Sequence, residues 1–200
     1  MQMHNSPRPK AAQISGRALL GALKYAKVLG GEDGPSALIS RLPTEELQLF
    51  SRPLRASAWY PYSIYGGLLR SIDGWPTTES DDPMRAFGRW GLQRDAGTVL
   101  RILSVFSSVE GLVQRGFGAW GAFLWNRHCN QGEVFLADSG EGTATMGLRG
   151  FPAIAKAHCR LTCGYLEAMG KAVGAHSIRM THTLCVHRGD PHCEYRGEWD

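Results

Sequence analysis

The sequence predicts an α+β domain in which N-terminal helices are followed by a hairpin, a helix and a second hairpin. Through the first two thirds of the chain, apolar residues recur at helical spacing. After Gly132 the pattern changes to two pairs of alternating segments around short turns, with one helical segment between the pairs. Strands that pair with their sequence neighbours form an antiparallel sheet, and we expect that sheet to pack against the helices.

The 200 residues, 43% of them hydrophobic, suit one globular domain. We divide it into a disordered tail at 1–13, a helical part at 14–130 and a sheet-containing part at 131–200. The net charge of +4 is spread without a dense Lys/Arg block, so we expect no nucleic-acid partner. No apolar run is long enough to cross a bilayer, and no signal sequence opens the chain, so we expect no membrane span and a cytoplasmic location.

The helical part contains several expected helices with recognisable ends. They span residues 14–29, 36–42, 44 onward, 59–72 and 83–94, and residues 98–106 and 109–124 form either one long helix or two. Gly30 and Gly31 end the first of them, and Thr44 and Asp82 are the expected N-caps. Pro83 then occupies the first helical position, which proline tolerates well.

The sheet-containing part begins with a hairpin in which residues 133–138 and 143–149 flank a turn at 139–142. A helix should open at Pro152 and end at Gly174. Residues 176–187 alternate as a strand, and residues 193–199 return as its antiparallel partner across a Gly-Asp-Pro turn.

Cysteine and histidine are concentrated around this last hairpin. Residues 159–193 contain Cys159, Cys163, Cys185 and Cys193 together with four histidines. Three interpretations compete: a hairpin that happens to hold these residues, a disulfide, or part of a metal site. Stable disulfides are unusual in the cytoplasm, whereas thiolates and imidazoles together suit a tetrahedral metal ion.

Strand parity gives the metal hypothesis a checkable consequence. His182 falls on the apolar face of its strand, and Cys185 falls on the opposite face. A bulge at Thr183-Leu184 would reverse the parity and bring His182, Cys185 and Cys193 onto one face. The metal hypothesis therefore predicts a backbone irregularity at this point.

Other motifs point away from catalysis. Residues 116–121 (GFGAWG) match a dinucleotide-binding pattern, but they lie within an apolar helical segment rather than after a strand. We find no hydrolase elbow or phosphate-binding loop, and we do not expect an enzyme. Aromatic residues gather before the first hairpin, where they form core or line a ligand cavity; those expected to line it are Phe106, Trp120, Phe123 and Trp125.

Residues 159–170 (CRLTCGYLEAMG) and 182–195 (HTLCVHRGDPHCEY) resemble the C-terminal half of the 4-vinyl-reductase-type small-molecule-binding domain. That domain is grouped with heme-nitric-oxide-binding-like domains and with the transport-protein-particle subunits of vesicle tethering. The resemblance implies that Cys159, Cys185 and Cys193 bind zinc. His182 stands where the family has Glu, so His182, Cys163 or a water molecule would be the fourth ligand.

The resemblance implies a small-molecule-binding sensor or adaptor module with a structural zinc site. It would bind an apolar small molecule and signal through contact with a partner protein or a second copy. We do not expect heme, because the Tyr-x-Ser-x-Arg motif of heme-binding relatives is absent, although His128 or His158 could be proposed as axial ligands. The alternatives are a scaffolding homodimer without ligand, a heme-binding gas sensor, and a reductase.

Overall fold

The computed structural model describes residues 11–76, 82–94, 103–106, 108–115, 125–151 and 154–200. The elements of its N-terminal part are β1 (Gln13–Ser15), α1 (Gly16–Gly30), α2 (Gly34–Ile39), α3 (Thr44–Leu47), β2 (Trp59–Pro61), α4 (Tyr62–Asp73), α5 (Pro83–Arg94) and α7 (Val109–Arg115). The C-terminal part consists of β3 (Glu133–Gly140), β4 (Thr143–Arg149), α9 (Lys156–Ala172), β5 (Ile178–Leu184) and β6 (Cys193–Trp199). Short 3₁₀ turns at Gly31–Asp33, Gln48–Ser51 and Val186–Arg188 complete the described elements.

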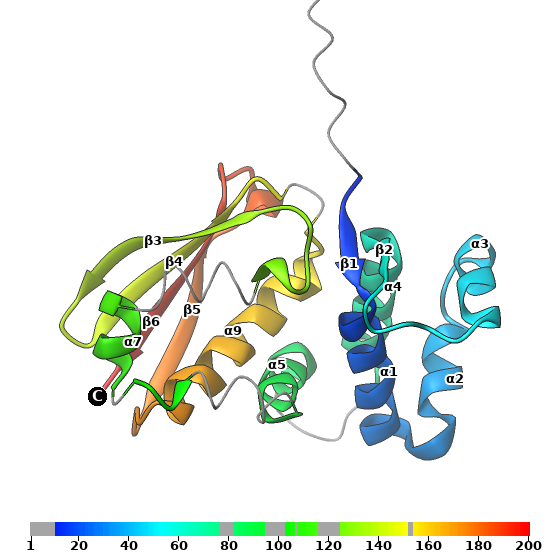
Figure 1. The fold of residues 1–200 in the computed structure, drawn as a ribbon, viewed down its shortest axis with the longest axis horizontal. Coiled ribbons are helices and arrows are strands. Elements are labelled where there is room, and N and C mark those ends of the chain that lie inside the picture. Colours follow the sequence, from blue (N-terminus) through cyan, green and yellow to red (C-terminus); the bar gives the residue numbers. More distant parts are fainter. Residues whose placement is uncertain (1–10, 77–81, 95–102, 107, 116–124, 152–153) are drawn as a thin grey trace, which may run out of the picture.

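The four strands of the C-terminal part form one antiparallel sheet in the order β3-β4-β6-β5. Each hairpin pairs sequence neighbours, and β4 joins the two hairpins by pairing with β6 from Thr143↔Glu198 to Leu148↔Cys193. Gly142 closes the first hairpin at a φ of 63°, a conformation that glycine adopts without strain. Figure 1 shows this sheet on one side of the molecule and α1 to α4 on the other, with α5 and α9 between them.

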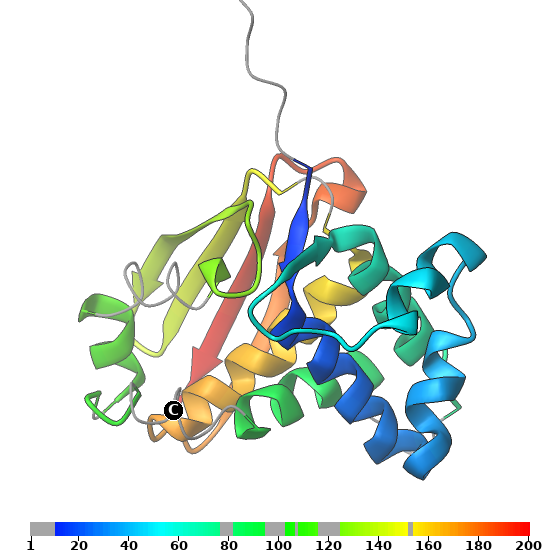
Figure 2. The same cartoon turned by 45° about the vertical axis from the view of Figure 1, so that its right-hand side comes forward.

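Helices α5 and α9 cross at unusually short range because both carry glycine at the crossing. A Cβ added to Gly88 would lie 2.1 Å from the carbonyl oxygen of Leu161. A Cβ added to Gly164 would lie 2.0 Å from the carbonyl oxygen of Arg85. Only glycine allows this backbone approach, which fixes the contact between the two helices of the central layer (Figure 2).

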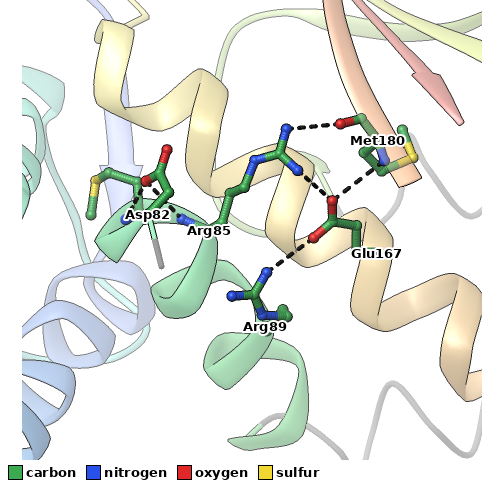
Figure 3. A network of polar contacts seen from close by, with 6 residues as sticks. Asp82, Arg85, Arg89, Glu167 and Met180 are labelled. Atoms are coloured by element: carbon green, nitrogen blue, oxygen red, sulfur yellow. Dashed lines mark hydrogen bonds and ion pairs between the residues drawn. The ribbon is translucent and has the colours of Figure 1, made fainter. Parts of the chain in front are cut away.

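A buried carboxylate ties this central layer to the sheet (Figure 3). Glu167 of α9 is 8% exposed and forms ion pairs with Arg85 and, at 3.0 Å, with Arg89 of α5. Its Oε1 also accepts a hydrogen bond from the Met180 backbone N–H of β5, while Arg85 donates to the Met180 carbonyl oxygen. The charge of Glu167 is therefore matched by two guanidinium groups that reach it from the neighbouring helix.

The structure confirms the predicted α+β class and the order of hairpin, helix and hairpin. Asp82 caps α5, since its Oδ1 accepts hydrogen bonds from the backbone N–H groups of Met84 and Arg85. The predicted cap at Thr44 is wrong, because Pro43 occupies the cap position and Thr44 is the first residue of α3. Residues 59–61 are also not helical: they form β2, which pairs with β1.

Parts of the predicted helices at 98–106 and 109–124, and the glycine motif at 116–121, lie outside the described residues; α7 is the described portion of the second helix. The first ten residues of the expected tail also lie outside them, and Gln13 already belongs to β1. Among the helices that the structure describes, none combines the length and apolar character that a bilayer crossing requires.

Candidate functional site: a cavity and a cysteine-histidine cluster

A cavity of about 150 Å³ lies between the N-terminal helices and the layer formed by α9 and the sheet. Its walls come from β1, α1, α4, α5, residues 125–128, β3, β4 and α9. Most of the lining is apolar, with Ile14, Phe87 and Trp125 among it. Elements from both ends of the chain therefore enclose one space.

A few polar side chains interrupt this apolar lining. His158 is 7% exposed and stacks on Trp125 at a centroid distance of 5.6 Å. Tyr65 contacts the same imidazole edge-on, at 5.5 Å between ring centroids. His128 and Arg94 also line the cavity, which gives it the combination of apolar wall and few polar groups typical of ligand sites.

His158 is held in the neutral state by its surroundings. Burial, with a smaller contribution from nearby His128, lowers the pKa of His158 to about 3. Its Nδ1 lies 2.8 Å from the Tyr62 hydroxyl oxygen, and that oxygen accepts a hydrogen bond from the Ala155 N–H. At neutral pH the imidazole is thus an uncharged group with a fixed orientation.

The structure places the predicted ligand-binding aromatics differently. Trp125 lines the cavity, whereas Phe106 packs against the core and is absent from the described lining. Trp120 and Phe123 lie outside the described residues. Tyr65 was not expected at this site, and His158 was considered only as an axial heme ligand. A core residue and a cavity residue share the same apolar spacing, so no local signal could separate them.

The second feature is a cluster of four potential metal ligands. Cys159 of α9 and Cys193 of β6 come together with His182 of β5 and Cys185, which follows β5. One potential ligand atom from each residue lies within 4.8 Å of those of the other three, and the Sγ atoms of Cys159 and Cys193 are 3.8 Å apart. The bulge on which this convergence depends is present: the β5–β6 register shifts between His182 and Leu184.

Backbone contacts preorganise the loop of this cluster. Asp190 accepts a hydrogen bond from the Cys185 N–H at 2.6 Å, and Gly189 turns the chain at a φ of 89°. The hydrogen bond with Cys159 lowers the pKa of the Cys193 thiol, which favours a thiolate at that position. The Nε2 of His182 is buried, and no described residue provides it with a hydrogen-bond partner.

Two further cysteines stand apart from the cluster. Cys163 lies one helical turn after Cys159, but it is not among the four grouped residues, so His182 and not Cys163 completes the set. Cys129 lies elsewhere, beside β1, and burial raises its pKa well above the usual range of a thiol. Neither of these buried thiols is poised as a nucleophile.

No protein-family model and no curated protein matches this chain. Solved structures do match it in fold. An H-NOX protein from Shewanella oneidensis in the Fe(II)NO ligation state superposes with a TM-score of 0.69, at 14% identity over 93% of this chain and 99% of the other. Fe(II) unliganded H-NOX from K. algicida gives 0.69 at 10% identity over 93% and 96%, and a mutant of T. Tengcongensis H-NOX gives 0.63 at 11% identity over 93% and 97%.

These comparisons correct the cofactor expectation. Zinc was expected and heme was not, yet the structures that share this fold are H-NOX proteins, of the heme-nitric-oxide-binding group, and several are described by the ligation state of ferrous iron. The group that accompanies this fold in its structural neighbours is therefore heme, and zinc as the cofactor is overturned. At identities of 10 to 15% the likeness concerns the fold alone: over nearly its whole length, this chain has the fold of the H-NOX domains.

Proposed function

We propose that this chain is a sensor domain for a small molecule and that the cavity is the site where the molecule binds. The cavity itself carries the proposal: it is mostly apolar and has a few polar groups in its wall. A cavity of about this volume accommodates a ligand the size of a single aromatic ring.

The position of the cavity explains how binding would be transmitted. One wall belongs to α1 and α4, and the opposite wall belongs to α9 and the sheet. A ligand between them contacts both layers at once, so its binding favours one relative arrangement of the layers over others. The changed surface would then be recognised by a partner protein or by a second copy of the chain.

The direct test is a titration of the purified chain with toluene, followed by native mass spectrometry and tryptophan fluorescence. Trp125 lines the cavity and should report occupancy. We expect one toluene bound per chain, and no binding of anthracene, whose three fused rings exceed the volume of the cavity. If toluene fails to bind, or if anthracene binds equally well, the cavity is not the sensing site.

A heme-dependent gas sensor is the second candidate, favoured by the likeness to the H-NOX structures. The donor types that heme uses are present, since two imidazoles and a guanidinium line the cavity: His128, His158 and Arg94. A porphyrin is larger than the described cavity of about 150 Å³, so heme would require the cavity walls to lie farther apart than they do in this structure.

Absorption spectroscopy separates the two candidates. The chain would be purified from cells supplied with a heme precursor, and hemin would also be added to the purified protein. A Soret band at one heme per chain would establish the second candidate and replace the first. An absent band, together with toluene binding, would establish the first.

We also propose that Cys159, His182, Cys185 and Cys193 bind a transition-metal ion with a structural role. Tetrahedral metal–thiolate sites with bonds of about 2.3 Å place neighbouring sulfurs about 3.8 Å apart. The sulfurs of Cys159 and Cys193 have this separation before any ion is added. A fourth ligand from His182 would also give its unpartnered Nε2 a role and leave no open position for chemistry.

Elemental analysis of the purified chain tests this site. We expect one transition-metal ion per chain and its loss on denaturation in the presence of a chelator. A metal-free protein whose melting temperature is unaffected by added metal ions would contradict the proposal.

A further inference from the structure

The hydrogen bonds around Tyr62 determine which nitrogen of His158 carries the proton. The Tyr62 oxygen already accepts the Ala155 N–H at 2.9 Å, and the neighbour left for its own hydroxyl proton is Nδ1 of His158, at 2.8 Å. Tyr62 therefore donates and Nδ1 accepts. A neutral imidazole has one N–H, so the proton is on Nε2.

This arrangement produces a hydrogen-bond donor on a side chain that lines the cavity. The Nε2–H of His158 has no hydrogen-bond partner among the described residues, because the contacts of His158 there are the Tyr62 hydroxyl, the backbone and the neighbouring rings. An apolar ligand would cover this donor without an acceptor, which is unfavourable, whereas a ligand with an acceptor atom would pair with it.

A second donor lies beside the first. Tyr65 is 5% exposed, lines the same cavity and meets the His158 ring edge-on. Within the described part of the chain its hydroxyl also has no hydrogen-bond partner. The two donors come from α4 and α9, on different walls of the cavity.

We propose that the ligand of this cavity is an uncharged molecule of single-ring size that carries a hydrogen-bond acceptor oxygen, such as an aromatic ketone, and that His158 and Tyr65 donate to that oxygen. This inference rests on the proposed function and specifies the chemistry of its ligand. An ionised ligand is disfavoured because the lining is mostly apolar and charge is costly to bury there. Arg94 at the cavity wall stacks its guanidinium on the Trp90 ring, 5.2 Å from the centroid.

Acetophenone and α-methylstyrene test the inference, because they share size and shape and differ in having C=O or C=CH₂. Calorimetric titration of the full chain should give about five- to tenfold tighter binding of acetophenone, the contribution of a net hydrogen bond. Equal affinities for the pair would overturn the inference while leaving the cavity proposal standing. If neither compound binds, both proposals fail. Tighter binding of benzoate than of acetophenone would overturn the assignment of an uncharged ligand.

Two substitutions test whether His158 and Tyr65 cause the preference for acetophenone over α-methylstyrene. Tyr65→Phe and His158→Phe should each reduce the ratio of acetophenone affinity to α-methylstyrene affinity severalfold. Tyr60→Phe is the matched control, since the Tyr60 hydroxyl accepts the Arg55 N–H and the residue is absent from the described lining. An unchanged preference in both donor variants would overturn the assignment, and Tyr65→Phe alone decides it if His158→Phe does not fold.

Discussion

At the scale of single residues, Glu167 shows how much one buried charge can contribute. Its carboxylate faces two guanidinium groups, so Glu167→Gln removes the negative charge that Arg85 and Arg89 both contact in a partly buried setting. Breaking a buried ion pair by removing one partner typically costs about 3–5 kcal/mol. Because the arginines keep some solvent contact, we expect the lower end of that range in the free energy of unfolding, measured with urea.

The matched control for this substitution is Glu133→Gln. Glu133 also pairs with an arginine, but its partner Arg149 and the carboxylate itself are largely exposed. Surface ion pairs of this kind are screened by solvent and contribute little. The midpoint of urea unfolding should therefore stay within error in the control, and a comparable loss in both variants would contradict the account of Glu167.

Substitutions of two cysteines, one inside the four-residue cluster and one outside it, test the proposed metal site. Cys193 belongs to the four-residue cluster, whereas Cys163 is a neighbouring buried thiol outside it. Cys193→Ser should lose the bound ion and destabilise the chain by several kcal/mol, because structural metal binding contributes directly to folding. Cys163→Ser should retain the ion, as measured by elemental analysis, and equal metal content in the two variants would contradict the proposed ligand set.

At the scale of elements, the crossing of α5 and α9 depends on the absence of side chains. Gly88→Ala places a methyl group against the Leu161 carbonyl of α9. Because the contacted atom belongs to the helix backbone, the clash is relieved only by moving a helix. Overpacking of this kind costs about 1–3 kcal/mol. Gly91 lies on the same helix, and a Cβ added there meets nothing within 4 Å. Gly91→Ala should thus be neutral or stabilising by up to about 1 kcal/mol, and chemical denaturation of both variants measures the difference.

The elements that the sequence predicted well are those whose signals are local. Asp82-Pro83 marks the start of α5 by capping chemistry, and the conflict of parity between His182 and Cys185 revealed the bulge. The elements that were missed depend on distant partners. The three-residue strands β1 and β2 exist because Ile14 pairs with Tyr60 across the intervening helices, and no property of three residues predicts such a pair.

The candidate sites likewise contain residues that the sequence predicted and residues that only the folded structure brings together. Cysteine and histidine were recognised as enriched around the last hairpin, but the choice of Cys159, His182, Cys185 and Cys193 came from the family resemblance, and the structure brings these four together. A ligand cavity lined by Trp125 was expected, but its polar groups could not be found, because Tyr65 and His158 come from α4 and α9 and only the folded chain brings them together. Spacing along one element identifies its buried face, but it does not say whether that face meets other side chains or an empty space.

At the scale of the whole molecule, the cavity lies between two layers that also meet through α5 and α9 and through the contact of β1 with residues 128–130. A ligand that binds the folded chain alone stabilises it by mass action, by about 2.7 kcal/mol at a concentration one hundred times its dissociation constant. For a chain of this length that corresponds to a rise of roughly 5–10 °C in melting temperature. We expect such a rise with acetophenone, measured by differential scanning calorimetry.

Gly91→Leu distinguishes binding in the cavity from binding elsewhere on the molecule. Gly91 lines the cavity, and an added side chain has open space before it, so leucine should fill part of the volume without disturbing the helix crossing at Gly88. The variant should fold with at least the stability of the parent chain, because filling a cavity restores contacts that its lining lacks. Its melting temperature should no longer respond to acetophenone. A full thermal response in Gly91→Leu would mean that the ligand contacts another surface, and the layers would then have to communicate by a route that does not pass through this cavity.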